Sequence, residues 1–169
     1  MDKSNLVLIG MPGAGKSTIG VILAKRMKMP FIDTDLLIQQ RENRFLQDII
    51  DSDGLERFLS IEEDTLLQIH AERHVIATGG SVVYSDRAMK HLAGSGKVVY
   101  LKLKFYQVER RIKNMESRGI AMSKGQRLLD LYREREPLYE KYADMIIDCS
   151  GKHIETIISE IRENFQKQI

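Results

Sequence analysis

The segment LVLIGMPGAGKST, residues 6–18, decides the fold that this sequence predicts. Four apolar residues lead into Gly10, and Gly15, Lys16 and Ser17 follow at the spacing G-x-x-x-x-G-K-S, which is typical of the phosphate-binding loop between a buried strand and a helix. Glycines let the backbone turn so that successive N–H groups face phosphate oxygens. The lysine reaches the β- and γ-phosphates, and the serine hydroxyl can bind Mg²⁺. An ordinary glycine turn would not explain the lysine and the hydroxyl. The predicted nucleotide-binding residues of the loop are Gly13, Ala14, Gly15, Lys16, Ser17 and Thr18.

The composition is that of a globular protein. The 169 residues are 43% hydrophobic and 30% charged, and this length fits a single domain, residues 1–169. The net charge of +2 is too small to indicate nucleic acid by itself, and no apolar run approaches the about 20 residues of a membrane span. The single cysteine, Cys149, excludes an internal disulfide and suits a reducing compartment. We therefore expect a cytoplasmic protein, a monomer, that binds neither nucleic acid nor membranes.

Short apolar runs alternate with longer segments of helical spacing along the chain. This alternation predicts a parallel sheet that is covered by helices on both sides. The runs are mostly apolar throughout, as expected for strands buried on both faces. Ligands bind at the carboxyl ends of such strands, so the residues after each run are candidates for the site. The predicted strands are residues 6–9, 30–32, 75–77, 98–103 and 145–147.

Two aspartates, Asp33 and Asp35, follow the second predicted strand. Asp33 is placed to hold Mg²⁺ directly or through water beside the phosphate loop. Asp35 is placed to accept a hydrogen bond from a substrate hydroxyl and to help orient or deprotonate it. The alternative is that one of the two caps a helix that begins near Leu36, which Asp35 is able to do.

The third predicted strand ends in the sequence Thr78-Gly79-Gly80-Ser81. Two glycines at a strand end allow a ligand to approach the backbone closely. Their N–H groups can then bind the oxygens of a metabolite. A plain loop is the alternative interpretation of these residues.

A basic segment follows the fourth predicted strand and contains Arg111 and Arg118. Residues 116–125 have little periodicity, which indicates a loop between two helices. A loop of this kind suits phosphoryl transfer, because its closure excludes water and brings a cation to the γ-phosphate. A solvated basic helix face is the alternative. In the next helix, residues 126–142, we expect Pro137 to kink or interrupt the helix at Glu136, so that Arg135 lies near a bend and can turn into a cleft.

In their order along the chain, these motifs resemble the shikimate kinase family of small phosphate-loop kinases. The matching segments are the phosphate loop, D-T-D at 33–35, the glycine pair, the two arginines and R-E-P-L-Y at 135–139. The resemblance implies an α/β fold, a P-loop NTPase-like three-layer sandwich. Its five-stranded parallel sheet has the order 2-3-1-4-5 with helices on both faces. It also implies a substrate-binding segment at about 34–60, a lid at about 112–126, and transfer of a phosphoryl group from ATP to the 3-hydroxyl of shikimate, in aromatic amino-acid biosynthesis.

The resemblance further implies a role for each matching residue, with ATP and Mg²⁺ as cofactors. The catalytic residues are Lys16, Asp35 and Arg118. Arg111 joins the phosphate loop in holding the nucleotide, and Ser17 and Asp33 hold the metal. The residues that bind the small-molecule substrate are Asp35, Phe58, Gly79, Gly80, Ser81 and Arg135.

The chain also departs from the family pattern. Where the substrate segment usually reads G-E-x-x-F-R, residues 54–59 read GLERFL. Leu55 replaces the glutamate, and Leu59 replaces an arginine expected on the substrate carboxylate. The two leucines share one helix face. Losing one such arginine weakens binding of a shikimate-like acid by roughly ten- to a hundredfold. Ser81 replaces a third glycine, and the lid reads R-G-I-A after residue 117 instead of R-P-L-L.

Two other functions stay open at this point. The first is a kinase of the same build for another hydroxy acid, such as gluconate, which the two leucines suggest. The second is a nucleotide-binding module without turnover, against which the intact Lys16, Ser17, Asp33 and Arg118 argue.

Overall fold

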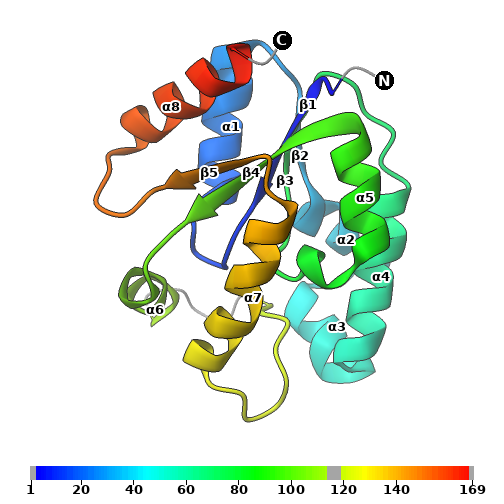
Figure 1. Cartoon of the computed structure of the whole chain (residues 1–169). Coiled ribbons are helices and arrows are strands. Elements are labelled where there is room, and N and C mark those ends of the chain that lie inside the picture. Colours follow the sequence, from blue (N-terminus) through cyan, green and yellow to red (C-terminus); the bar gives the residue numbers. More distant parts are fainter. Residues whose placement is uncertain (1–2, 114–118, 168–169) are drawn as a thin grey trace.

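The computed structural model describes residues 3–113 and 119–167. At its centre lies a parallel five-stranded sheet of order β2-β3-β1-β4-β5 (Figure 1). The strands are β1 (Asn5–Ile9), β2 (Phe31–Asp33), β3 (Val75–Ala77), β4 (Gly96–Lys102) and β5 (Met145–Asp148). All five predicted strands are present, with bounds that differ by at most two residues, and the predicted sheet order is confirmed.

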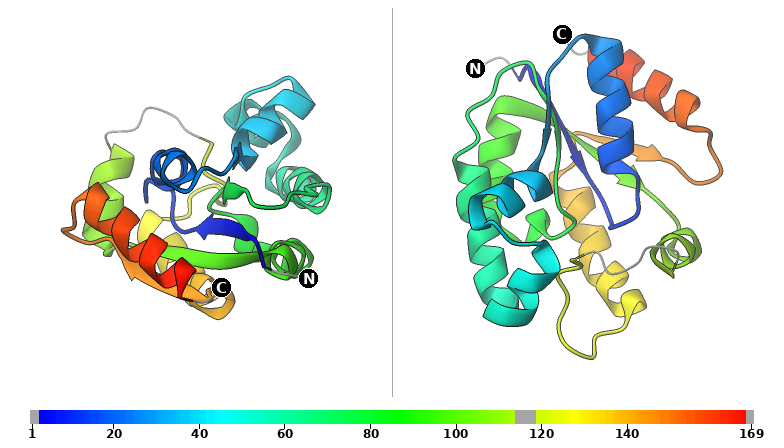
Figure 2. Two further views of the ribbon diagram at one scale, coloured as in Figure 1. Left: turned by 90° about the horizontal axis from the view of Figure 1, so that it is seen from above. Right: turned by 180° about the vertical axis from the view of Figure 1, so that it is seen from behind.

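Helices cover both faces of this sheet, as predicted. The helix α1 (Lys16–Met27) packs beside α8 (Ile154–Gln166) on one face, and α5 (Asp86–Ser95) and α7 (Leu128–Tyr142) lie on the other (Figures 1 and 2). The remaining helices are α2 (Thr34–Glu42), α3 (Leu46–Asp53), α4 (Leu55–Leu67), the 3₁₀ helix η1 (Val82–Tyr84) and α6 (Phe105–Lys113). The three-layer α/β architecture is therefore confirmed.

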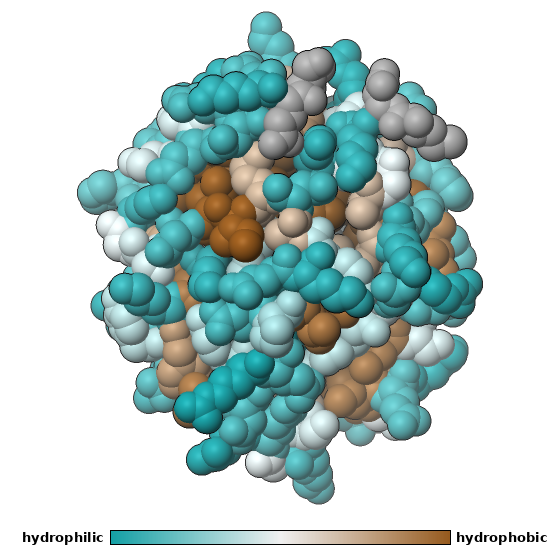
Figure 3. Space-filling view, in the orientation of Figure 1, coloured by the Kyte–Doolittle hydropathy of each residue, from teal (hydrophilic) through white to brown (hydrophobic). Residues whose placement is uncertain are grey.

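Two apolar clusters hold these layers together. The larger cluster is built on β1, in which Leu6 to Ile9 have no exposed surface, because strands buried on both faces are apolar throughout. The smaller cluster lies between α2, α3 and α4 and includes Ile38, Ile49 and Phe58. The face of the molecule in Figure 3 is largely hydrophilic, with small apolar patches between polar side chains. Within the described residues, no helix has the length and apolarity needed to cross a membrane.

The structure corrects the expectation for Pro137. The helix α7 runs without a break from Leu128 to Tyr142, with Pro137 inside it, so the predicted interruption at Glu136 is wrong. Proline removes one hydrogen bond of the helix, to the carbonyl four residues earlier. That carbonyl belongs to Arg133, which is exposed and can bond to water instead. The ring of Tyr139, stacked on Tyr100 at a centroid distance of 5.0 Å, anchors the helix beyond the proline.

Candidate active site

The phosphate loop joins β1 to α1 in the conformation that its glycines allow. Gly13 and Gly15 have φ angles of 79° and 91°, which non-glycine residues rarely adopt. The helix α1 starts directly after the loop, so its free N–H groups face the site. The Lys16 ammonium donates hydrogen bonds to the carbonyls of Gly10 (2.7 Å) and Met11 (2.9 Å). Burial lowers the pKa of Lys16 to about 8, against the raising influence of Asp35.

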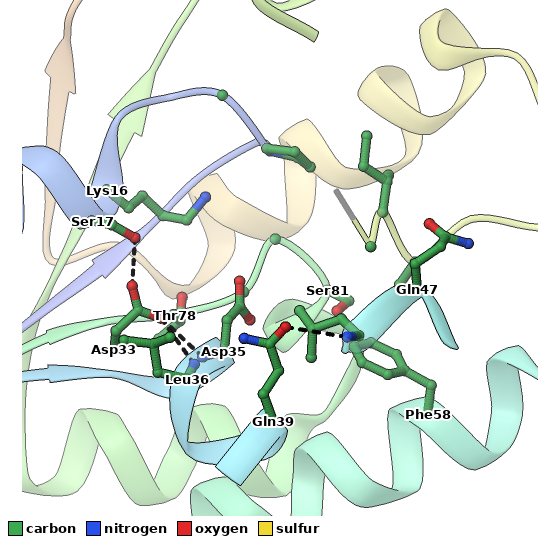
Figure 4. A pocket seen from close by; sticks show the side chains of 18 of the residues that line it. Lys16, Ser17, Asp33, Asp35, Leu36, Gln39, Gln47, Phe58, Thr78 and Ser81 are labelled. Carbon is green, nitrogen blue, oxygen red and sulfur yellow. Dashed lines mark hydrogen bonds between the residues drawn. The ribbon is translucent and has the colours of Figure 1, made fainter. Parts of the chain in front are cut away.

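Asp33 links the phosphate loop to the start of α2. Its Oδ2 accepts a hydrogen bond from the Ser17 hydroxyl at 2.6 Å, and its Oδ1 accepts from the backbone N–H groups of Asp35 (3.0 Å) and Leu36 (3.4 Å) (Figure 4). Asp33, and not Asp35, is therefore the residue that caps the helix, and α2 begins at Thr34 rather than near Leu36. The next acidic residue, Asp35, lines the cavity.

The Ser17 hydroxyl and the Asp33 carboxylate form a pair of oxygen donors that suits Mg²⁺. This ion prefers oxygen ligands, and protein sites commonly supply only one or two of them while phosphates and water supply the rest. In residues 3–113 and 119–167 there is no group of three or more His, Cys, Asp or Glu side chains that could hold a metal alone. The donor set therefore fits an ion shared with a nucleotide rather than an all-protein site.

Arg135 of α7 is fully buried beside the glycine pair that follows β3. A Cβ atom on Gly80 would lie 2.9 Å from its Nη1. Its Nε donates to the Tyr84 hydroxyl at 3.2 Å, its Nη2 donates to the Ala121 carbonyl, and its guanidinium lies 5.1 Å from the Tyr84 ring centroid. These hydrogen-bond partners within the described residues are neutral oxygens. The positive charge of Arg135 thus lies at the cavity with room for an anionic ligand.

Glu62 of α4 contacts the same loop on the side that faces away from the cavity. It is 2% exposed, and its Oε2 accepts a hydrogen bond from the Ser81 hydroxyl at 2.7 Å. Its Oε1 has no hydrogen-bond partner among the residues that the structure describes. Burial raises the pKa of Glu62 to about 7, and the hydrogen bond from Ser81 opposes this only in part.

These groups meet at one cavity of about 530 Å³, shown in part in Figure 4. Its walls come from the phosphate loop, the ends of β2 and β3, the segment from α2 to α4, residues 119–121, and Arg135 of α7. The cavity brings together twelve of the residues predicted from the sequence, which are Gly13, Gly15, Lys16, Ser17, Thr18, Asp33, Asp35, Phe58, Gly79, Gly80, Ser81 and Arg135.

Other predicted residues lie elsewhere. Ala14 packs in the main apolar cluster, and Arg111 donates from Nη1 to the Gly13 carbonyl at 2.9 Å without lining the cavity. Arg118 lies outside the described residues. Leu55 and Leu59 are half-buried against the smaller apolar cluster and do not line the cavity either. The two leucines therefore form part of the packing between α4 and its neighbours.

The family resemblance places a substrate-binding segment at about 34–60, but sequence reasoning does not single out the residues of this segment that form the outer wall. The outer wall includes Leu36, Gln39, Phe45, Leu46 and Gln47. No motif marks these side chains, because their place depends on how α2 and α3 fold back. Glu62 left a signal: it lies four residues after Phe58, so helical periodicity puts an acidic residue on the face that carries a predicted substrate residue.

Comparisons with known proteins agree with this geometry. The family model described as shikimate kinase matches residues 12–166. A shikimate kinase of Francisella philomiragia is 37% identical in an alignment of 161 positions that covers 93% of this chain and 92% of the relative. The structure of shikimate kinase from Acinetobacter baumannii in complex with shikimate has a TM-score of 0.90 and 26% identity and covers 99% of this chain and 95% of that one. A gluconokinase from Sinorhizobium meliloti, at a TM-score of 0.55 and 19% identity with 98% and 97% coverage, shares the fold alone.

Proposed function

The chain belongs to the shikimate kinase family, and from this we propose that it transfers the γ-phosphoryl group of ATP to a hydroxyl of shikimate. One observation carries the proposal: a phosphate loop with its lysine and a fully buried arginine line the same cavity. The first is suited to a nucleoside triphosphate, and the second to the carboxylate of a small acid. Asp35 lines the cavity as well and supplies a carboxylate for the acceptor hydroxyl.

The transfer needs little covalent chemistry from the protein. The acceptor oxygen forms a bond to the γ-phosphorus as the bond between this phosphorus and the bridging oxygen of ADP breaks. Lys16 and the N–H groups of the phosphate loop stabilise the charge on the phosphate oxygens. Asp35 accepts the hydrogen bond of the acceptor hydroxyl and receives its proton. The buried position of Lys16 supports this role, because charges act more strongly away from water.

We also propose that Ser17 and Asp33 hold a Mg²⁺ ion. Their hydrogen bond of 2.6 Å shows that the two oxygens already lie close together. When bound, the ion neutralises charge on the β- and γ-phosphates. The cap that Asp33 forms on α2 keeps this carboxylate in place beside the loop.

At the acceptor end, Arg135 binds the carboxylate of shikimate, while Gly79, Gly80, Ser81 and Phe58 shape the pocket. Arg118 acts as the lid arginine on the strength of the family resemblance. We further propose one kinase domain over residues 1–169, with a substrate-binding segment at about 34–60 and a lid at about 112–126, that works as a cytoplasmic monomer. The position of Gly119, Ile120 and Ala121 on the cavity wall supports a lid that closes over the acceptor.

A second acceptor deserves a direct test, because Leu59 does not line the cavity and Arg135 is the cation at its acceptor end among the described lining residues. The experiment measures ADP release by the purified protein with MgATP and either shikimate or gluconate. We expect turnover on shikimate at least tenfold above that on gluconate. Turnover on gluconate alone would show that gluconate, and not shikimate, is the acceptor. ATP binding without turnover on either acid would show that the protein is a nucleotide-binding module and not a kinase.

A further inference from the structure

Glu62 contacts the backbone of the loop after β3, and this loop forms part of the acceptor end of the cavity. A Cβ atom on Gly79 would lie 2.6 Å from Glu62 Oε1 and 2.8 Å from Asp35 Oδ1. The Glu62 carboxylate therefore lies against the backbone of Gly79, which lines the cavity. The Ser81 hydroxyl that bonds to Glu62 Oε2 belongs to another such residue. Glu62 itself is not part of the cavity wall and acts on it from behind.

The groups that act electrostatically on Glu62 come from several elements. Arg135 of α7 and Lys16 of α1 stabilise its negative charge, and Asp35 of α2 opposes it. Charged groups on two other helices that pack against α4 are paired with residues other than Glu62. Arg87 of α5 pairs with Glu63 at 2.9 Å, and Asp53 of α3 pairs with Arg44 at 2.7 Å. Tyr84 of η1 lies against Arg135.

Arg135 therefore serves two anions. Within the described residues its hydrogen bonds go to neutral oxygens. Glu62 Oε1 lies against Gly79 and Arg135 Nη1 lies against the next residue, Gly80, so the charge of Arg135 offsets that of ionised Glu62 through space. A carboxylated acceptor that binds Arg135 removes this compensation and adds a negative charge near Glu62. A proton on Glu62 relieves the conflict without breaking a described hydrogen bond, because Oε1 has no partner and Oε2 continues to accept from Ser81.

We propose that Glu62 is a positioning residue that couples acceptor binding to proton uptake: the acid binds to Arg135 while a proton binds to Glu62. This inference rests on the proposed function, since it needs an acceptor with a carboxylate. Ionised Glu62 competes with the acceptor for the charge of Arg135, and neutral Glu62 does not. The acceptor pocket therefore binds the anionic acid more tightly when Glu62 carries a proton.

The coupling has a defined size and sign. With a pKa of about 7 before the acceptor binds, Glu62 is about half ionised at pH 7. If the bound acid keeps it protonated, about 0.5 proton is taken up per acceptor at pH 7 and close to one at pH 8. The same linkage weakens the apparent affinity for the acid about tenfold between pH 6 and pH 8.

Isothermal titration of shikimate into the full-length protein tests this coupling, with MgADP present throughout so that the donor end does not change. Runs in two buffers of different ionisation enthalpy at pH 7 and pH 8 count the protons. The variant is Glu62→Gln, which keeps an oxygen for the Ser81 hydroxyl but cannot ionise. The matched control is Glu63→Gln, one residue further on, whose carboxylate pairs with Arg87 instead.

We expect the wild type and Glu63→Gln to take up protons as stated, and Glu62→Gln to take up none and to bind shikimate equally well from pH 6 to pH 8. A merely structural role for Glu62 would change affinity without changing proton uptake. Binding to the wild type without uptake, or equal uptake by Glu62→Gln, overturns the inference. The ADP-release assay tests the proposed function separately: phosphorylation of shikimate without proton uptake leaves that function intact. If the assay selects gluconate, the titration is made with gluconate and judged in the same way.

Discussion

The donor end of the cavity comes from one continuous segment, residues 6–18, whereas the acceptor end comes from elements far apart in the sequence. At the donor end the phosphate is bound mainly by the backbone, through the glycines with left-handed φ angles and the N-terminus of α1. At the acceptor end Asp35, Gly79 and Arg135 lie on α2, after β3 and on α7. A phosphate is recognised by local backbone geometry, while a particular acid is recognised by side chains that only tertiary packing brings together. A change at one end should therefore affect binding at that end much more than binding at the other end.

The largest effect is expected at the donor end, for Lys16→Ala. Loss of one group that stabilises the transition state typically lowers kcat by about 10²–10³-fold, and we expect a loss at the upper end of this range because the ammonium is buried. The Michaelis constant for shikimate should change less than threefold. Steady-state kinetics with both substrates measure this, and Lys25→Ala on the same helix is the control. A large change in the shikimate constant would show that the two ends are not independent.

The next effect is on the stability of the folded protein, and it depends on pH through Glu62 at the acceptor end. Because the pKa of Glu62 is raised from 4.5 to about 7 in the folded protein, the folded state holds more of this proton than the unfolded state between these values. The contribution of protonated Glu62 to the free energy of unfolding is thus fully present below pH 4.5 and is lost as the pH rises through 7. The free energy of unfolding of the wild type should fall relative to that of Glu62→Gln by about 3 kcal/mol between pH 4.5 and pH 7.5.

Urea unfolding of both proteins at these two pH values gives the difference, and Glu63→Gln should show little of it. A difference between wild type and Glu62→Gln that does not vary with pH would mean that the folded protein holds Glu62 ionised throughout. The inference about proton uptake would then lose its basis as well.

The contrast between the ends also explains what the sequence predicts well. The strands follow from apolar runs, and their parallel arrangement follows from the alternation of strands and helices. The order of the strands comes from the family resemblance instead. The phosphate loop follows from a motif whose residues are neighbours in sequence. The wall formed by Gln39, Phe45 and Gln47 depends on the fold-back of α2 and α3, for which the sequence has no local signal. The unbroken α7 was missed for a related reason, since the packing of Tyr139 outweighs the local preference of Pro137.

At the acceptor end, Arg135→Lys should weaken the acid and not the nucleotide. A lysine keeps the charge but loses the planar pair of donors that a carboxylate accepts. A hydrogen bond to a charged group contributes about 1.5–3 kcal/mol, so we expect the Michaelis constant for shikimate to rise about ten- to a hundredfold. The constant for ATP should stay within twofold. The control is Arg133→Lys, an exposed arginine of the same helix. An equal rise in the constant for ATP would contradict the separate roles of the two ends.

The smallest effect is expected for Gly119→Ala, which tests how the described end of the loop before α7 meets the acceptor wall. A Cβ atom there would lie 2.5 Å from Leu46 Cβ and 2.9 Å from the Gln47 backbone nitrogen, so the loop must move away from α3. That movement shifts the Ala121 carbonyl, which accepts a hydrogen bond from Arg135. Overpacking of this kind costs about 1 kcal/mol or more, which corresponds to a rise of about fivefold in the Michaelis constant for shikimate.

The same substitution at Gly94 makes a matched control, because no atom lies within 4 Å of a Cβ atom at that position of α5. Gly94→Ala should leave both Michaelis constants unchanged and raise the free energy of unfolding by about 0.5–1 kcal/mol, as expected for alanine in place of glycine in a helix. If Gly119→Ala instead raises the constant for ATP as much as that for shikimate, the loop at 119–121 serves both ends. The acceptor end would then be less separate from the phosphate loop than its side chains indicate.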